Sequence, residues 1–221
     1  MPMNLSTIQM NDTVHHRVYA AWTMPSPRRS PAPEERRRDA DRTREALLDA
    51  ALAEFGAKGL AGARTSEIAA RAGVNKQLIS YYFGGKDGLY QAILERWYAQ
   101  EAQLSEPGIS LEELAYRYLE AGHRQPDLQR LFVREEMEAD PDTTERDPDS
   151  QDLADLRARQ AAGEIAGELD PAFVLLVLQA AVISGIVFPR DAKRLMGLDP
   201  ASPEYLEHMG EQLRRLVRRL A

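Results

Sequence analysis

The chain has 221 residues and no cysteine, which excludes disulfide bonds and thiolate metal sites. Its formal net charge of −7 is unevenly divided: residues 28–89 hold 12 Lys and Arg against 9 Asp and Glu, whereas residues 90–221 hold 15 against 25. A weakly basic segment joined to an acidic one is typical of a protein that binds phosphates at one end only.

The composition favours helices throughout. Alanine, leucine, glutamate and arginine dominate, aromatic residues make up 7%, and no convincing run alternates apolar and polar residues as strands do. We therefore expect an all-α fold. Polar residues interrupt the N-terminal stretch, so it lacks the apolar core of a signal peptide. The expected location is cytoplasmic, without a membrane partner.

Residues 1–40 are expected to form a disordered N-terminal arm, because four prolines between residues 25 and 33 interrupt any helix. The basic cluster Arg36, Arg37 and Arg38 follows them. Two alternatives remain open for it: a solvated run of charges, or an arm that lies along DNA phosphates or in a minor groove.

A first amphipathic helix is predicted from about Thr43 to Lys58, where apolar residues recur every three or four positions and Gly59 ends the pattern. Its apolar stripe consists of Leu48, Ala51, Leu52 and Phe55. This helix would pack against the elements that follow. Arg44, near its start, either reaches a phosphate or is merely exposed.

Two short helices joined by a glycine turn are predicted between Thr65 and Phe83. We expect the Thr65 hydroxyl to cap the first helix, Gly73 to end it in the left-handed conformation, and Asn75 to cap the second. Apolar residues four positions apart, such as Ile79 and Phe83, give each helix a face to bury. This is the skeleton of a helix-turn-helix, whose second helix is free to enter a DNA major groove.

The second helix carries polar side chains at its outward positions. All of them can form hydrogen bonds with phosphates or base edges: Asn75, Lys76, Gln77, Ser80 and Tyr81. The Gly85-Lys86 pair that follows is not part of a nucleotide-binding P-loop. That motif needs glycine where this chain has Ser80, and Ser or Thr where it has Asp87.

The stretch VNKQLISYYFGGKDGLY, from Val74 to Tyr90, resembles the third helix and the start of the fourth helix of TetR-family transcriptional repressors. The stretch ALLDAALAEFGAKGLAGARTSEIAARAG before it resembles their first two helices. The resemblance implies an N-terminal three-helix helix-turn-helix domain over residues 41–89 and a C-terminal helical ligand-binding and dimerisation domain over residues 90–221. It further implies a homodimer that binds a palindromic operator in double-stranded DNA and releases it when a small-molecule effector enters the larger domain.

Position by position, the resemblance implies DNA contacts from Thr65, Ser66, Lys76, Gln77, Leu78, Tyr81, Tyr82 and Lys86. Asn75 joins them because of its outward position. Two positions depart from the family pattern: Ser80 replaces a usual tyrosine, and Leu78 stands where a small polar residue is common. We therefore expect fewer phosphate contacts and a contact between Leu78 and a thymine methyl group.

Two later helices predict a subunit interface. The stretch from Pro171 to Phe188 is the most apolar in the chain, and its pattern indicates a helix buried on nearly all sides, by its own domain and by a second subunit. A final amphipathic helix is predicted from Pro203 to Leu220. The candidate interface residues on these helices are Val177, Val182, Phe188, Leu206, Leu213 and Leu216.

Aromatic and apolar residues of the larger domain are candidates for an effector pocket, with ordinary core packing as the alternative for each: Tyr116, Tyr118, Leu119, Phe132, Met137, Phe173 and Leu176. No charged or metal-binding cluster among them indicates an effector type, and we predict no cofactor and no metal site. Two other functions stay open: a helical protein-interaction adaptor that has lost operator binding, or an enzyme with an unrecognised site in the C-terminal domain. The only carboxylate-rich stretch lacks a His, Ser or Lys partner at useful spacing, which disfavours an enzyme.

Overall fold

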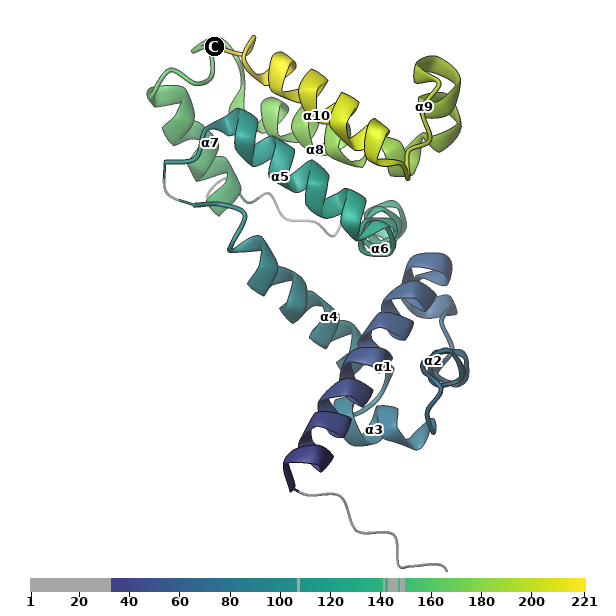
Figure 1. Cartoon of the computed structure of the whole chain (residues 1–221). Coiled ribbons are helices and arrows are strands. Elements are labelled where there is room, and N and C mark those ends of the chain that lie inside the picture. The colour runs from purple at the N-terminus through teal and green to yellow at the C-terminus, as the bar shows by residue number, and fades with distance from the viewer. Residues whose placement is uncertain (1–32, 107, 141, 143–146, 148–149) are drawn as a thin grey trace, which may run out of the picture.

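The computed structural model describes residues 33–106, 108–140, 142, 147 and 150–221. Within this part of the chain it contains ten α-helices and no strand, which confirms the expected all-α fold (Figure 1). The helices are α1 (Pro33–Gly62), α2 (Thr65–Ala72), α3 (Gln77–Phe83), α4 (Lys86–Glu101), α5 (Leu111–Arg124), α6 (Pro126–Glu138), α7 (Gln151–Ala161), α8 (Pro171–Val187), α9 (Pro189–Met196) and α10 (Pro203–Val217). In Figure 1, α1 to α3 form the lower lobe, α5 and α7 to α10 form the upper lobe, and α4 runs between the two.

Helix α1 begins at Pro33, so the expected disordered arm over residues 1–40 is wrong for its last part; residues 1–32 lie outside the described residues. A proline is tolerated at the first helical position because its missing N–H would have no partner there. Glu34 and Glu35 follow in the first turn, where the helix dipole favours acidic side chains. This proline therefore starts a helix instead of breaking one.

One hydrophobic core holds α1 to α4 together. At its centre lies Phe55 of α1, which is fully buried. The large side chains buried around it include Leu47, Ile68, Ile79, Leu89 and Ile93. Each such side chain stabilises the fold by about 1.5–3 kcal/mol, so this small lobe has a sufficient core to hold α3 in a fixed position.

Helix α6 packs into the same core through Leu128 and Leu131. Its backbone lies very close to α1, because a Cβ atom added to Gly56 would come within 2.6 Å of the Asp127 carbonyl oxygen. Arg134 of α6 also donates a hydrogen bond to the Gly56 carbonyl, at 3.2 Å. The two lobes are therefore joined through α6 as well as through the continuous helix α4.

A second core lies in the upper lobe, between α5, α7, α8 and α10. Its buried members are Leu111, Ala115, Leu119, Leu156, Ile165, Val174, Leu178, Leu213 and Val217. Helices α5 and α10 cross at Gly210, where an added Cβ would lie 2.5 Å from the ring of Tyr116. The missing side chain of Gly210 therefore allows this close crossing.

Helix α8 is buried on one side only. Val174 and Leu178 are buried, whereas Phe173 and Leu176 are 59% and 66% exposed. The upper lobe therefore covers one face of this helix, as expected for its own domain, and burial of the other face by a second subunit stays a prediction. Within the described residues no single helix is long and apolar enough to cross a membrane; α8 and α9 meet the length and composition criteria only as a pair, bent by 88°.

Candidate nucleic-acid interface

The turn between α2 and α3 has the predicted glycine geometry. Gly73 ends α2 with φ 68° and ψ 29°, a left-handed conformation that L side chains rarely adopt, and its N–H donates to the Ala70 carbonyl. The predicted cap at Thr65 is wrong, because Thr65 is already the first helical residue. Arg64 precedes it in an extended conformation and supplies no side-chain cap.

Helix α3 is short and well defined. The Oδ1 atom of Asn75 accepts a hydrogen bond from the Gln77 N–H at 2.8 Å, so Asn75 caps this helix as predicted. Ile79 anchors its inner face in the core with 1% of its surface exposed. Gly84 then ends the helix with φ 73°.

The polar residues predicted to point outward from α3 are all exposed: Asn75, Lys76, Gln77, Ser80 and Tyr81. Tyr81 has 78% of its surface exposed. Leu78 and Tyr82 differ, because both are half-buried against the core of the lower lobe. The packing of Leu78 therefore disfavours the expected thymine contact. Of the two positions at the start of α2, Thr65 is half-buried and Ser66 is exposed.

Arg44 of α1 holds the end of α3. Its guanidinium lies 4.7 Å from the centroid of the Phe83 ring and donates to the Tyr82 carbonyl at 3.4 Å. A cation over an aromatic face contributes about 0.5–1 kcal/mol at an exposed site. Of the two alternatives left open for Arg44, neither describes this contact, which fixes α3 relative to α1.

Lys86 occupies a structural position. Its ammonium donates to three carbonyls at the end of α1: Leu60 at 2.8 Å, Ala61 at 3.4 Å and Ala63 at 3.5 Å. These carbonyls follow a break in α1 at Gly59, where φ is 70° and ψ is 168°. Carbonyls in the last turn of a helix lack partners within it, so a lysine ammonium there is stabilising. Lys86 therefore caps the last turn of α1. The DNA contact that the resemblance implied for Lys86 stays a prediction.

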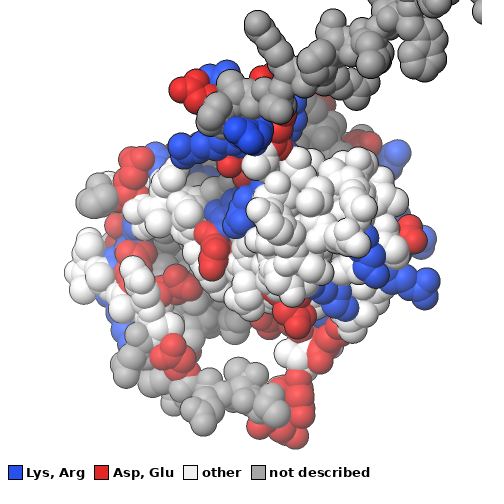
Figure 2. Space-filling view, turned by 90° about the horizontal axis from the view of Figure 1, so that it is seen from below, with Lys and Arg blue, Asp and Glu red and all other residues white. Residues whose placement is uncertain are grey.

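Exposed basic side chains lie on the same end of the molecule as α3. Figure 2 looks onto this end of the molecule and shows Lys and Arg side chains, with Asp and Glu side chains between them, around an uncharged central area. The exposed basic residues of α1 to α3 and their connections include Arg36, Arg37, Arg38, Arg42, Arg44, Arg64, Arg71 and Lys76. A polar helix face within such a rim is suited to a polyanion with readable edges, as in duplex DNA.

Comparison with known proteins agrees with this geometry. The family model "Bacterial regulatory proteins, tetR family" matches residues 47–93. The HTH-type transcriptional repressor SCO4008 of Streptomyces coelicolor is 32% identical over 190 residues, which cover 82% of this chain and 98% of that repressor. The chain belongs to the TetR family. It is a transcriptional regulator with a DNA-binding helix-turn-helix domain.

Two further comparisons place this TetR-family chain more broadly. The HTH-type transcriptional regulator RutR of Escherichia coli K12 is 27% identical over 195 residues, which cover 83% of this chain and 92% of RutR. The solved structure of Streptomyces coelicolor SCO4942 has a TM-score of 0.61 at 24% identity, and the match covers 79% of this chain and 97% of that one. This second likeness shows a shared fold.

The side chains predicted to line an effector pocket in this TetR-family protein are not brought together. Leu119 is buried in the upper core, whereas Phe132 packs edge-on against Trp97 in the lower one, with ring centroids 6.0 Å apart. Three others are exposed: Met137, Phe173 and Leu176. An apolar spacing indicates which residues avoid water, and it does not indicate which of two cores they join.

Tyr118 of α5 takes part in a polar contact with α4. Its hydroxyl donates to the carboxylate of Glu101 at 3.2 Å, near the end of α4. Burial raises the pKa of the Glu101 carboxyl, against the lowering effect of this hydrogen bond. Burial, and then the neighbouring Glu101 carboxylate, also raise the pKa of the Tyr118 hydroxyl. The pair therefore ties α4 to α5 and does not line an open cavity.

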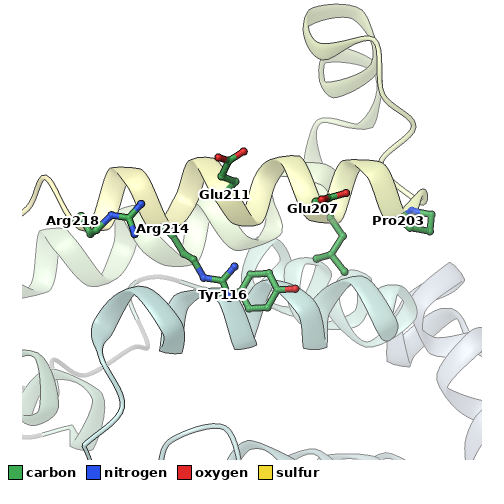
Figure 3. A pocket seen from close by; sticks show the side chains of 7 residues that line it. Tyr116, Pro203, Glu207, Glu211, Arg214 and Arg218 are labelled. Atoms are coloured by element: carbon green, nitrogen blue, oxygen red, sulfur yellow. The ribbon is translucent and has the colours of Figure 1, made fainter.

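Among the predicted pocket residues, Tyr116 lines a groove between α5 and α10 (Figure 3). The groove has a volume of about 510 Å³, and Leu206 and Pro203 form its apolar part. The Arg214 guanidinium lies 3.5 Å from the Tyr116 ring centroid and forms an ion pair with Glu113 at 2.8 Å. Its cationic group is therefore already satisfied by the protein.

The predicted interface residues divide into two groups. Val177, Phe188 and Leu216 are exposed and available to a partner. Leu213 is 3% exposed and belongs to the core of its own chain, and Val182 and Leu206 are half-buried against that core. Leu213 is therefore wrong as an interface residue, since the apolar stripe of α10 mainly faces α5 and α8.

The sequence did not indicate the positioning roles of Arg44, Lys86 and Arg134, although Arg44 and Lys86 were assigned other roles from it. A signal existed for Arg44, which stands four residues before Leu48 and in line with the apolar stripe of α1, where a charged side chain needs a partner. Lys86 and Arg134 contact carbonyls far away in the sequence. Their roles became visible only once the helices were placed.

Proposed function

We propose that the protein is a repressor that binds a palindromic operator as a homodimer and releases it when a small molecule binds the C-terminal domain. The observation that carries the proposal is the exposed polar face of α3, presented by the buried Ile79 and the Gly73 turn. Its side chains can donate to phosphates and base edges in the major groove. Repression is supported by the relative SCO4008, which is named a transcriptional repressor.

Dimerisation is supported by the open face of α8. The exposed apolar residues at this face and the end of the helix are Phe173, Leu176, Val177, Val187 and Phe188. Contiguous apolar surface of this kind marks protein interfaces. Pairing of α8 with α8 of a second copy about a two-fold axis would present two α3 helices to the two half-sites of a palindrome.

Release by an effector would act through α4 and α6, because both pack into the core that positions α3. Leu89 of α4 and Leu128 of α6 lie in the same cluster as Ile79. A ligand that displaces either helix would change the separation of the two α3 helices. Operator affinity would fall only by as much as the ligand prefers the displaced state.

The proposed function is tested by selecting operator DNA from a random duplex pool with the full chain. We expect a palindromic consensus whose half-sites lie about one helical turn apart, or a multiple of it, and two chains bound per duplex in sedimentation. A pool that yields no enriched sequence contradicts operator binding. If the chain then also forms a protein complex whose stability does not depend on salt, the adaptor function replaces the repressor.

A further inference from the structure

The first turns of α1 project beyond the helix-turn-helix core. Residues 34–39 are helical, and every one of them is exposed. The core itself begins at Leu47, the first buried residue of α1. The helix therefore has 14 residues, 33–46, before its first buried side chain, which is roughly 21 Å at the rise of an α-helix.

Charges in this projecting part are divided between two faces. Arg37 stands seven residues before Arg44, which places both in line with the stripe that includes Leu48 and Phe55. Arg36 lies beside them, one turn before the half-buried Ala40. The acidic residues Glu34 and Asp41 border Arg37 at three and four positions, on the side of the helix that also carries Glu45 and Arg38, whereas Arg36 lies on the other side of Arg37. The net charge of residues 34–45 is therefore near zero, although Arg36, Arg37 and Arg44 lie on one side of the helix, which we call the basic face.

This basic face points toward the same side of the molecule as α3. Arg44 marks the direction, because it touches the end of α3 through the Phe83 ring at 4.7 Å. Arg37 lies two helical turns further along the same line, about 10 Å beyond Arg44. Figure 1 places the N-terminal end of α1 and helix α3 together at the lower end of the molecule, and Figure 2 shows basic side chains on that end.

Arg36 and Arg37 on this face are also available for an anion. Arg42, on another side of the helix, already pairs with Asp39 at 3.6 Å. Arg36, Arg37 and Arg38 form no ion pair within 4.0 Å with any residue that the structure describes. Guanidinium groups without carboxylate partners, next to a recognition helix, match the spaced phosphates of a duplex.

We propose that Arg36 and Arg37 bind DNA phosphates beside the base pairs that α3 reads, so that α1 extends the footprint of each subunit in a sequence-independent way. The proposal rests on the proposed function, because it takes the duplex to lie against α3. Such contacts position the protein without specifying bases. They add equally to the affinity for operator and for unrelated DNA.

The test compares two variants of the full chain that remove the same charge from the same helix: Arg36→Gln with Arg37→Gln, and Arg38→Gln with Arg42→Gln. Glutamine keeps the helix propensity of arginine, and circular dichroism checks that the fold is retained. Affinity is measured by fluorescence anisotropy across a salt series, for a selected operator and for an unrelated duplex of equal length. The slope of log affinity against log salt reports how many phosphates the protein neutralises, at about 0.9 for each phosphate.

We expect the Arg36 and Arg37 variant to lower the magnitude of the slope by about 2 on both duplexes, and the Arg38 and Arg42 variant by less than half as much. Unchanged slopes in both variants overturn the proposal, and equal decreases in both overturn the assignment to one face. A failure of the proposed function looks different, because the parent chain would then bind the two duplexes with equal affinity at every salt concentration.

Discussion

Replacement of Lys86 by methionine separates the structural role of this residue from a role in DNA contact. Methionine keeps most of the aliphatic length of lysine and removes the ammonium that donates to the carbonyls of Leu60, Ala61 and Ala63 at 2.8–3.5 Å. A hydrogen bond to a charged group contributes about 1.5–3 kcal/mol, and the lower value suits a half-buried site. We expect a loss of about 1.5 kcal/mol, which lowers Tm by about 3–6 °C for a chain of this length.

The matched control is Lys76→Met, which removes the same charge from an exposed position on α3. Thermal unfolding is followed by circular dichroism at one fixed protein concentration, because the stability of a dimer depends on concentration. DNA affinity is followed over a salt series. We expect Lys86→Met to lower Tm without changing the salt slope, and Lys76→Met to lower the slope by about 0.9 without changing Tm. A reduced slope with unchanged Tm for Lys86→Met would refute the capping role.

Three further outcomes follow from the packing and the charges. Gly56→Ala places a Cβ within 2.6 Å of the Asp127 carbonyl oxygen, so we expect it to lower the free energy of unfolding, measured with denaturant, by about 1–3 kcal/mol. In the control Gly62→Ala the new Cβ meets only the Lys58 side chain, at 3.4 Å, so this variant should be neutral or stabilising. Equal effects of the two substitutions would contradict the close approach of α1 and α6. The Lys58 ammonium, 2.7 Å from the buried Glu54 carboxylate, lowers the pKa of that carboxyl below its usual 4.5 in spite of burial. The pair therefore contributes stability above about pH 4.5 that is lost as the pH falls through the lowered pKa, so the difference in Tm between the parent and Glu54→Gln should shrink in acid; a constant difference would count against the pair. Leu176→Glu on the open face of α8 should give monomers in sedimentation velocity, while Met137→Glu, at the 82% exposed position on α6, should leave the dimer intact.

The helix-turn-helix could be predicted from the sequence because its signals act locally. Gly73 ends α2 through its own backbone conformation, and Asn75 caps a residue two positions away. The contacts that hold this element in place are long-range: Arg44 reaches a carbonyl 38 residues away, and Lys86 reaches one 26 residues away. No local pattern contains such partners, so both residues were assigned to DNA or to solvent.

The contacts of the upper lobe were harder to predict for a related reason. Apolar periodicity shows that one side of α10 avoids water, and it gives no information on whether its own chain or a second chain covers that side. Leu213 faces the core of its own lobe, whereas Leu216 is 48% exposed on the same helix. The same holds for the pocket candidates, because Leu119 and Phe132 pack in different cores and no local pattern separates them.

We propose that the exposed face of α3 reads the operator sequence. The most direct measurement is the ratio of affinities for a selected operator and an unrelated duplex, compared between the parent chain and a Lys76→Ala, Gln77→Ala variant. Removal of one good base contact costs about 1–3 kcal/mol, so the variant should lose about tenfold or more of this ratio. Arg124→Ala, at an exposed position on α5 in the upper lobe, should leave the ratio unchanged. An unchanged ratio in the α3 variant, with its fold intact, would contradict the reading of operator sequence by α3.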